Sequence, residues 1–472
     1  MVELLKLTDD VAKKKINISD FLDYLVLDAL KKKASDIHIE SKEDNMLLIR
    51  YRIDGVLHDV IPVGDDLKDS LLFIIKVRAR LRTDIHFAPQ DGKILFNVKK
   101  TEIDVEIPKE EEVKEKVEEP KEEEKKEEKK KGKKEEPKEE EKEGLVEGIM
   151  SKFTRDEDKV KDTYHVDARI SILPVTHGEK VVIRLLSQAN RSFGLTDLGF
   201  EETDLVNLEK AYREPYGLIL VTGPTGSGKT TTLYSILKIL NTKDVNITTI
   251  EDPVEYSIDG VNHIQINTKG DLTFANGLRS ILRQDPNIIM VGEIRDTETA
   301  RITVNSALTG HLVLSTLHAN DAVSTIPRLI DMGIEPFLIA STINIVVTQR
   351  LARRLCPHCR KEYIVSKNEK HKELLKLRPD IQRHLAHVDK LYEAVGCKEC
   401  HNTGYSGRIG IYEILAMNKE LRDVIIEKPN SDNILAVAKK NGFNLMVEDG
   451  VKKLKRGDID IRELIKVIAI KE

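Results

Sequence analysis

A glycine-rich stretch between an apolar run and a helical pattern constrains this chain more than any other feature. Residues 223–230 have the sequence Gly-Pro-Thr-Gly-Ser-Gly-Lys-Thr, which fits G-x-x-x-x-G-K-[ST], and residues 218–222 before it form a short apolar strand candidate. Glycines let backbone N–H groups close around phosphate oxygens, and the N-terminus of the next helix adds partial positive charge. An ordinary glycine-rich turn is the alternative, which this position disfavours. The stretch therefore predicts a phosphate-binding loop (P-loop).

The loop also predicts which residues bind a nucleotide and its metal ion. Lys229 can reach the β- and γ-phosphates, and the Thr230 hydroxyl can ligate Mg²⁺. We therefore expect ATP and Mg²⁺ to bind here. The nucleotide-binding residues expected in and beside the loop are Gly223, Pro224, Thr225, Gly226, Ser227, Gly228, Lys229, Thr230 and Thr231.

Strand and helix patterns alternate from Leu198 onwards, which predicts a parallel sheet covered by helices. Acidic residues follow two of the strand candidates, in residues 250–255 and 288–296. Ligand groups gather at the carboxyl ends of parallel strands, where carboxylates can hold Mg²⁺ or polarise a water. Each cluster alone is more typical of a solvated loop. Following a P-loop, both are expected to face the nucleotide.

Two histidines, His311 and His318, flank an apolar strand candidate. A histidine in such a place is usually structural. Near a γ-phosphate it could instead sense the nucleotide state, because its charge is readily tuned near neutral pH. The spacing alone does not decide between these two roles.

All four cysteines lie in two Cys-x-x-Cys pairs, a pattern that suits a metal site in a reducing compartment better than disulfides. The predicted Zn²⁺ ligands are Cys356, Cys359, Cys397 and Cys400. Four protein ligands leave no open coordination position, so the role would be structural. The alternatives are two unconnected reduced pairs, or His358 and His401 as substitute ligands.

An N-terminal α/β block is predicted before the P-loop. A helix begins near Ile18 with Ser19 as a plausible N-cap, and Asp54-Gly55 is typical of a hairpin turn. A second helix is expected over 71–82. Strand patterns occupy 36–39, 47–53, 94–107, 164–172 and 180–186.

A Lys/Glu-rich segment interrupts this block. Residues 109–143 contain 13 Lys and 17 Glu, a net charge of −4 against −5 for the whole chain. With almost no apolar residues to bury, the segment is predicted to be disordered, and a functionless spacer is the favoured interpretation. The rest of the chain is close to neutral and shows no basic stripe interleaved with aromatics, so no direct nucleic-acid partner is expected.

The resulting fold class is α/β: an N-terminal α/β domain, a RecA-like P-loop domain, a zinc-bearing subdomain and a helical C-terminal tail. The expected divisions are 1–17, a short N-terminal segment; 18–190, interrupted by the insertion 108–162; 191–197, a linker; 198–355, the ATPase domain; 356–416, the zinc subdomain; and 417–472, the tail. No stretch reaches the length of a transmembrane helix and no secretory signal is recognised, which favours a soluble, cytoplasmic protein.

Together these motifs resemble the secretion ATPases that assemble type IV pili and type II secretion pseudopili. The resemblance extends from about Ile18 to the C-terminus, apart from the insertion. The supporting motifs are Ser-Asp-Ile-His-Ile-Glu at 35–40, Arg-Tyr-Arg-Ile-Asp-Gly-Val-Leu at 50–57, Pro-Gln-Asp-Gly at 89–92, His-Gly-Glu-Lys at 177–180, the P-loop, Glu-Asp-Pro-Val-Glu at 251–255, the Glu293 strand, the two histidines and the paired cysteines.

The resemblance implies a homohexamer in which the N-terminal domain covers ATP bound to the RecA-like domain. It implies that Glu255 is the general base, that Glu293 organises Mg²⁺ and water, and that His311 and His318 sense the nucleotide. It also implies four phosphate-side arginines, which without the resemblance would be interpreted as surface salt bridges. These are Arg169, Arg184, Arg279 and Arg283.

The implied function is a motor at the cytoplasmic face of the inner membrane, coupled to a membrane platform protein. The paired cysteines favour the assembly branch over the retraction branch. Two departures are expected: no extra N-terminal domain before residue 18, and the Lys/Glu insertion. The alternatives are a retraction or DNA-uptake motor, or a nucleotide-gated binding module with little turnover.

Overall fold

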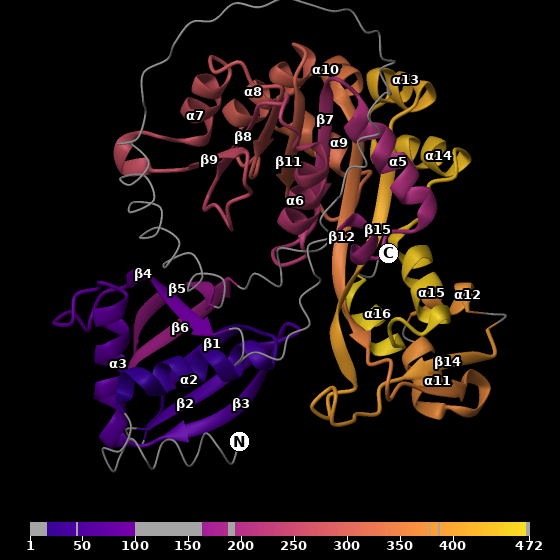
Figure 1. The fold of residues 1–472 in the computed structure, drawn as a ribbon. Coiled ribbons are helices and arrows are strands. Elements are labelled where there is room, and N and C mark those ends of the chain that lie inside the picture. The colour runs from indigo at the N-terminus through magenta and orange to yellow at the C-terminus, as the bar shows by residue number, and fades with distance from the viewer. Residues whose placement is uncertain are drawn as a thin grey trace, which may run out of the picture. The chain divides into compact units, whose positions relative to one another are not determined.

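The computed structural model describes residues 17–43, 46–99, 163–186, 194–376, 378–385 and 388–468. It divides into two compact units, residues 1–192 and 193–472, which are described separately (Figure 1). Residues 1–16 of the short N-terminal segment and the whole Lys/Glu insertion, 108–162, lie outside the described residues.

The first unit is an antiparallel sheet with two helices on one face (Figure 1). The strand order is β3-β2-β1-β6-β5-β4. Its elements are α2 (Ile18–Lys31), β1 (Ala34–Ser41), β2 (Leu47–Ile53), β3 (Val56–Val63), α3 (Asp65–Arg78), β4 (Gln90–Lys99), β5 (Thr163–Val175) and β6 (Gly178–Leu186). Alternate strand residues pack against α2 and α3 in one core, so the residues between them lie on the opposite face of the sheet.

Local chemistry explains where two elements of this unit begin and end. Asp54 and Gly55 both have positive φ, 48° and 84°, and Ile53 pairs with Val56, as the predicted two-residue hairpin requires. The N-cap of α2 is Asn17 and not Ser19: the Asn17 side chain accepts the Ser19 N–H at 3.0 Å.

The position of α3 also differs from the prediction. This helix begins at Asp65, six residues before the predicted start, and ends at Arg78. Its buried positions, Leu67, Leu71, Leu72 and Ile75, recur at helical spacing across the whole element. The apolar pattern used for the prediction covered only the later part of this face.

The second unit is built on a seven-stranded sheet of order β15-β12-β7-β11-β10-β8-β9. All neighbouring strands are parallel except β12 and β15. The strands are β7 (Gly217–Thr222), β8 (Ile247–Glu251), β9 (Val261–Gln265), β10 (Ile288–Val291), β11 (Leu312–Leu317), β12 (Ile343–Leu355) and β15 (Tyr405–Ala416). This arrangement is the α/β fold predicted from the sequence.

Helices cover both faces of this sheet (Figure 1). Along β7, Leu218 and Leu220 belong to one core, whereas Ile219 and Val221 belong to the other. The elements around these cores are η3 (Leu195–Leu198), α5 (Glu202–Arg213), α6 (Lys229–Leu240), η4 (Thr268–Gly270), α7 (Phe274–Ile281), α8 (Thr297–Leu308), α9 (Thr325–Asp331), α10 (Pro336–Thr342), α13 (Lys419–Glu427) and α14 (Ser431–Lys440). A strand buried on both sides explains why β7 is continuously apolar.

The remaining elements form a further core beside the long strands β12 and β15. They are β13 (Lys361–Ile364), η5 (Val365–Lys367), α11 (Glu369–Lys376), α12 (Pro379–His384), β14 (Lys390–Glu393), α15 (Met446–Arg456) and α16 (Ile461–Val467). The C-terminal helices are therefore divided: α13 and α14 pack on the main sheet, and α15 and α16 pack in this further core. None of the helices in the described residues is long and apolar enough to cross a membrane.

Candidate nucleotide and metal sites

The P-loop connects the carboxyl end of β7 to the first turn of α6, and its backbone requires glycine at two positions. Gly223 has φ 139°, and a Cβ there would lie 2.4 Å from the carbonyl oxygen of Gln349. Gly228 has φ 88°, and a Cβ there would lie 3.0 Å from the Gln349 side chain. Both conformations are strained for residues with a side chain. The two glycines therefore let the loop pass close to Gln349 of β12.

A cation and an unpaired hydroxyl lie in this loop. The Lys229 Nζ donates to the carbonyl oxygens of Gly223 at 2.9 Å and Pro224 at 3.1 Å. Burial lowers the pKa of Lys229, and the charge of Glu293 acts in the opposite direction. The Ser227 hydroxyl is buried and has no hydrogen-bond partner among the described residues. This donor set at a helix N-terminus fits the oxygens of a polyphosphate.

Gln349 of β12 holds the loop in place and was missed by the sequence analysis. Its Nε2 donates to the Ser227 carbonyl at 2.6 Å, and its Oε1 accepts from the Thr232 hydroxyl at 2.8 Å. Beside it, the Thr222 and Thr348 hydroxyls are 2.6 Å apart. The available signal was the polar pair Thr348-Gln349 directly after an apolar strand pattern.

A charged network lies at the carboxyl ends of the neighbouring strands. Glu293 follows β10, forms an ion pair with Arg295, and lies 3.5 Å from the Nε2 of His318, which follows β11. Arg295 also approaches Asp252, after β8, at 3.7 Å. Because β7, β11, β10 and β8 are parallel and adjacent, these residues share the sheet edge from which the P-loop emerges.

Glu255 lies on the loop between β8 and β9. Its side chain is half-buried, and its backbone hydrogen-bonds to the hydroxyl of Tyr234 on α6, the helix that the P-loop opens. The same hydroxyl donates to the buried carboxylate of Glu251 at 2.5 Å. The two acidic residues of this segment therefore differ: Glu251 is enclosed, and Glu255 remains partly accessible.

The two histidines lie at opposite ends of β11. His318 follows its carboxyl end, on the P-loop edge, whereas His311 precedes its amino end and hydrogen-bonds to the Ser306 carbonyl at 3.0 Å. A strand of this length separates them by about 20 Å. Of the two histidines, only His318 lies at the carboxyl ends of the strands, where the P-loop begins. Within one chain the expected nucleotide-sensing pair is therefore not brought together.

The arginines predicted on the phosphate side, Arg279 on α7 and Arg283 just after that helix, contact residues of their own unit. Arg279 forms an ion pair with Glu298 in the first turn of α8. Arg283 donates to the Arg279 carbonyl at 2.9 Å and to the Ser280 hydroxyl at 3.1 Å. Both side chains are exposed rather than engaged with the P-loop of their own chain.

In the first unit, Arg169 and Arg184 lie directly opposite each other on β5 and β6. Both belong to the face of the sheet that α2 and α3 leave open, because the residues on either side of them pack inward. The Nε of Arg184 donates to Asp36 at 3.0 Å, while its side chain stays 60% exposed and that of Asp36 only 8%. A buried carboxylate thus holds one edge of an accessible guanidinium group.

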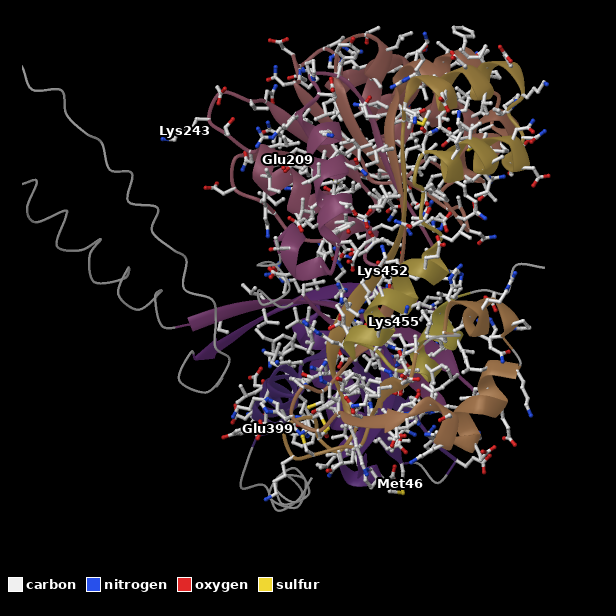
Figure 2. The ribbon with its side chains drawn as sticks, turned by 90° about the vertical axis from the view of Figure 1, so that its right-hand side faces the viewer. Met46, Glu209, Lys243, Glu399, Lys452 and Lys455 are labelled. Carbon is white, nitrogen blue, oxygen red and sulfur yellow. The ribbon has the colours of Figure 1, made fainter. Side chains whose placement is uncertain are left out.

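The four cysteines converge on one point beside β12 and β15. Their sulfur atoms all lie within 4.8 Å of one another, with separations of 3.9 Å for Cys356–Cys397, 3.8 Å for Cys359–Cys400 and 3.7 Å for Cys397–Cys400. Tetrahedral Zn²⁺ with Zn–S bonds of about 2.3 Å places its sulfurs about 3.8 Å apart. The cluster therefore has the ligand type and spacing of a structural zinc site. Glu399, between the last two cysteines, marks it in Figure 2.

Comparison with known proteins agrees with this architecture. The sequence model of a family described as type II/IV secretion system protein matches residues 11–110 and 156–466. The type IV pilus assembly ATPase PilB of Myxococcus xanthus is 38% identical over 98% of this chain and 69% of its own length. The type II secretion system protein E of Pseudomonas aeruginosa is 39% identical over 93% of this chain and 73% of its own length.

Solved structures share the fold at lower identity. The ATPase DotB of Legionella pneumophila has a TM-score of 0.58 and 20% identity, covering 94% of both chains. The pilus retraction motor PilT with bound ADP has a TM-score of 0.54 and 21% identity, covering 94% of this chain and 96% of its own. With the family match over most of its length and a P-loop at the expected sheet edge, the chain belongs to the type II/IV secretion system protein family.

Proposed function

We propose that this protein is a Mg²⁺-dependent ATPase that works as a homohexameric motor for the assembly of a type IV pilus or a type II secretion pseudopilus. The names of its relatives, an assembly ATPase and a type II secretion protein E, support the pathway. One observation carries the chemistry: Lys229 lies in the glycine-rich loop at the carboxyl ends of the strands, and the charge of Glu293 acts on it. Enzymes that transfer phosphoryl groups use a cation to bind the phosphates and a carboxylate to hold Mg²⁺.

The P-loop residues 223–230 and Thr231 would hold the triphosphate of ATP through backbone N–H groups and Lys229. Thr230 and Glu293 would hold Mg²⁺, directly or through water. When bound, the ion would neutralise charge on the phosphate oxygens. The accessible carboxylate of Glu255 would accept the proton of the attacking water, and His318 would contact Glu293 and respond to its charge.

Hydrolysis also needs positive charge on the equatorial oxygens of the transferred group. Arg169 and Arg184 would supply it from the first unit. Arg279 on α7 and Arg283, two residues after the end of that helix, are both exposed and would contact the phosphates of a nucleotide bound in the ring. His311 lies at the other sheet edge, and we give it no role at the nucleotide of its own chain.

The motor would act at the cytoplasmic face of the inner membrane, where a platform protein would receive the movement of the ring. The cysteine cluster would bind one Zn²⁺ per chain. Because all four ligands come from the protein, this ion would brace the long strands β12 and β15 and take no part in hydrolysis.

Substitution of the P-loop lysine tests the proposal. Lys229→Ala should lower steady-state phosphate release from ATP and Mg²⁺ by on the order of a hundredfold or more, because it removes the charge that compensates the γ-phosphate. Lys243→Ala, an exposed lysine of the same unit (Figure 2), should retain wild-type turnover. Full turnover in Lys229→Ala would refute the site. Negligible turnover in the wild type would favour a nucleotide-gated binding module.

A further inference from the structure

A buried carboxylate links the P-loop helix to the loop that carries Glu255. The Glu251 side chain is only 3% exposed, yet it accepts three hydrogen bonds. Its partners are the Tyr234 hydroxyl at 2.5 Å, the Thr249 hydroxyl at 2.6 Å and the His263 Nδ1 at 2.9 Å. A buried carboxylate must be compensated in this way, because desolvation penalises an unpaired charge strongly.

His263 connects this carboxylate to the backbone of the same loop. It lies on β9, with its side chain 6% exposed. Its Nε2 accepts the N–H of Ile258 at 3.0 Å. A ring nitrogen that accepts carries no proton, so the proton of the neutral ring is on Nδ1, which faces Glu251. The ring therefore bridges Glu251 and the far end of the loop.

Tyr234 makes the matching connection at the near end of the loop. Its hydroxyl donates to Glu251 and also hydrogen-bonds to the backbone of Glu255. The Tyr256 ring packs edge-on against the Tyr234 ring, with centroids 4.7 Å apart. Because Tyr234 belongs to α6, which begins at the P-loop lysine, the loop is fixed to the same helix that would hold the phosphates.

We infer that Tyr234 and His263 are positioning residues that, through Glu251, hold the backbone of Glu255 at a set distance from the P-loop. The inference rests on the proposed function, in which Glu255 is the general base. Neither side chain needs to touch the nucleotide. Their contribution is geometric: a base displaced by about 1 Å from the attacking water can lose about a hundredfold in rate.

The test compares five variants of this chain with the wild type in steady-state ATP hydrolysis. His263→Ala and Tyr234→Phe each remove one connection and should lower kcat by about 10- to 100-fold. The KM for ATP and the affinity for a fluorescent ATP analogue should change much less, because the phosphate cradle is untouched. His263→Gln should keep most of the wild-type kcat, because an amide can both donate to Glu251 and accept from Ile258.

Tyr405→Phe is the matched control. It deletes a hydrogen bond of the same kind, from a tyrosine hydroxyl to the Asp460 carboxylate at 2.7 Å, in the further core rather than beside the P-loop. It should lower the melting temperature about as much as Tyr234→Phe does and leave kcat unchanged. Equal kcat in His263→Ala and the wild type, or equal losses in His263→Ala and His263→Gln, would overturn the inference.

Glu255→Gln separates this inference from the function on which it rests. If Glu255→Gln abolishes turnover while His263→Ala and Tyr234→Phe keep it, the general base stands and only the positioning role fails. If Glu255→Gln itself turns over at the wild-type rate, the assignment of the base fails. In that case, a lower kcat in His263→Ala or Tyr234→Phe could not come from displacement of the general base, and the positioning role would fail as well.

Discussion

At the scale of single residues, the electrostatics of the site centre on Lys229 and Glu293. Burial makes the ammonium group harder to keep charged, so the pKa of Lys229 lies below its ordinary value, and the Glu293 carboxylate opposes this change. A lysine is charged below its pKa and loses its proton as the pH rises through it. The ability of the free protein to capture a triphosphate should therefore decline at alkaline pH.

Glu293→Gln should move this alkaline decline to lower pH. The substitution removes the charge that raises the pKa of Lys229 and leaves the burial that lowers it. We expect the affinity for a fluorescent ATP analogue, measured from pH 7 to pH 10, to fall earlier in the variant than in the wild type. Glu298→Gln, which alters an exposed acid that pairs with Arg279, is the control and should leave the pH profile in place. A shift to higher pH would contradict the coupling.

At the scale of elements, the sequence was most informative where local chemistry alone determines the conformation. The P-loop, the Asp54-Gly55 turn and the buried strand β7 were recognisable because glycine freedom and apolar continuity leave few alternatives. The start of α3 was placed late because its first turns are mostly polar, Leu67 being the early exception. The N-cap of α2 was misassigned by two residues because Asn and Ser are both good caps.

Other parts of the site depend on contacts between distant segments and had no local signal. Gln349 reaches the P-loop from a strand more than a hundred residues later, and His263 reaches Glu251 across two neighbouring strands. His311 illustrates the reverse case. The family resemblance implied that His311 and His318 form a pair, but the six-residue strand β11 places them at its opposite ends. Topology, rather than composition, decided which residues meet.

The cysteine cluster beside β12 and β15 gives a direct prediction about metal binding. Cys397→Ser should reduce bound zinc from one ion per chain to well below one, measured by atomic absorption, because the hydroxyl of serine is a poor replacement for a thiolate ligand. The melting temperature should fall as well, because binding of a structural ion stabilises the folded state. His401→Ala should retain full zinc, since four sulfurs already complete the tetrahedron. Loss of zinc in His401→Ala but not in Cys397→Ser would reverse the ligand assignment.

At the scale of the whole molecule, the proposed reaction draws on both units. The second unit provides the phosphate cradle, Glu255 and Glu293, whereas Arg169 and Arg184 belong to the open sheet face of the first. Asp36 holds the Arg184 guanidinium by its Nε and leaves the group largely exposed. Such an anchored, planar cation is suited to approach an anion delivered to that face.

Arg184→Ala should therefore lower kcat by about 10³-fold or more, the range measured for arginines that stabilise phosphoryl transfer, with a small change in the KM for ATP. Arg82→Ala removes an arginine of the same unit that is 69% exposed and pairs only locally with Asp84 among its described contacts, and it should retain activity. Phosphate release at saturating ATP measures both variants.

Light scattering with a non-hydrolysable ATP analogue distinguishes lost chemistry from lost assembly. Wild type and Arg184→Ala should both have about six times the mass of the 53.5 kDa chain. Because Arg184 is proposed to act only on the transition state, the variant should remain hexameric while its kcat falls. Normal hydrolysis in Arg184→Ala would show that Arg184 supplies no catalytic charge. A rate that falls only because the ring has dissociated would show that Arg184 makes contacts between copies instead.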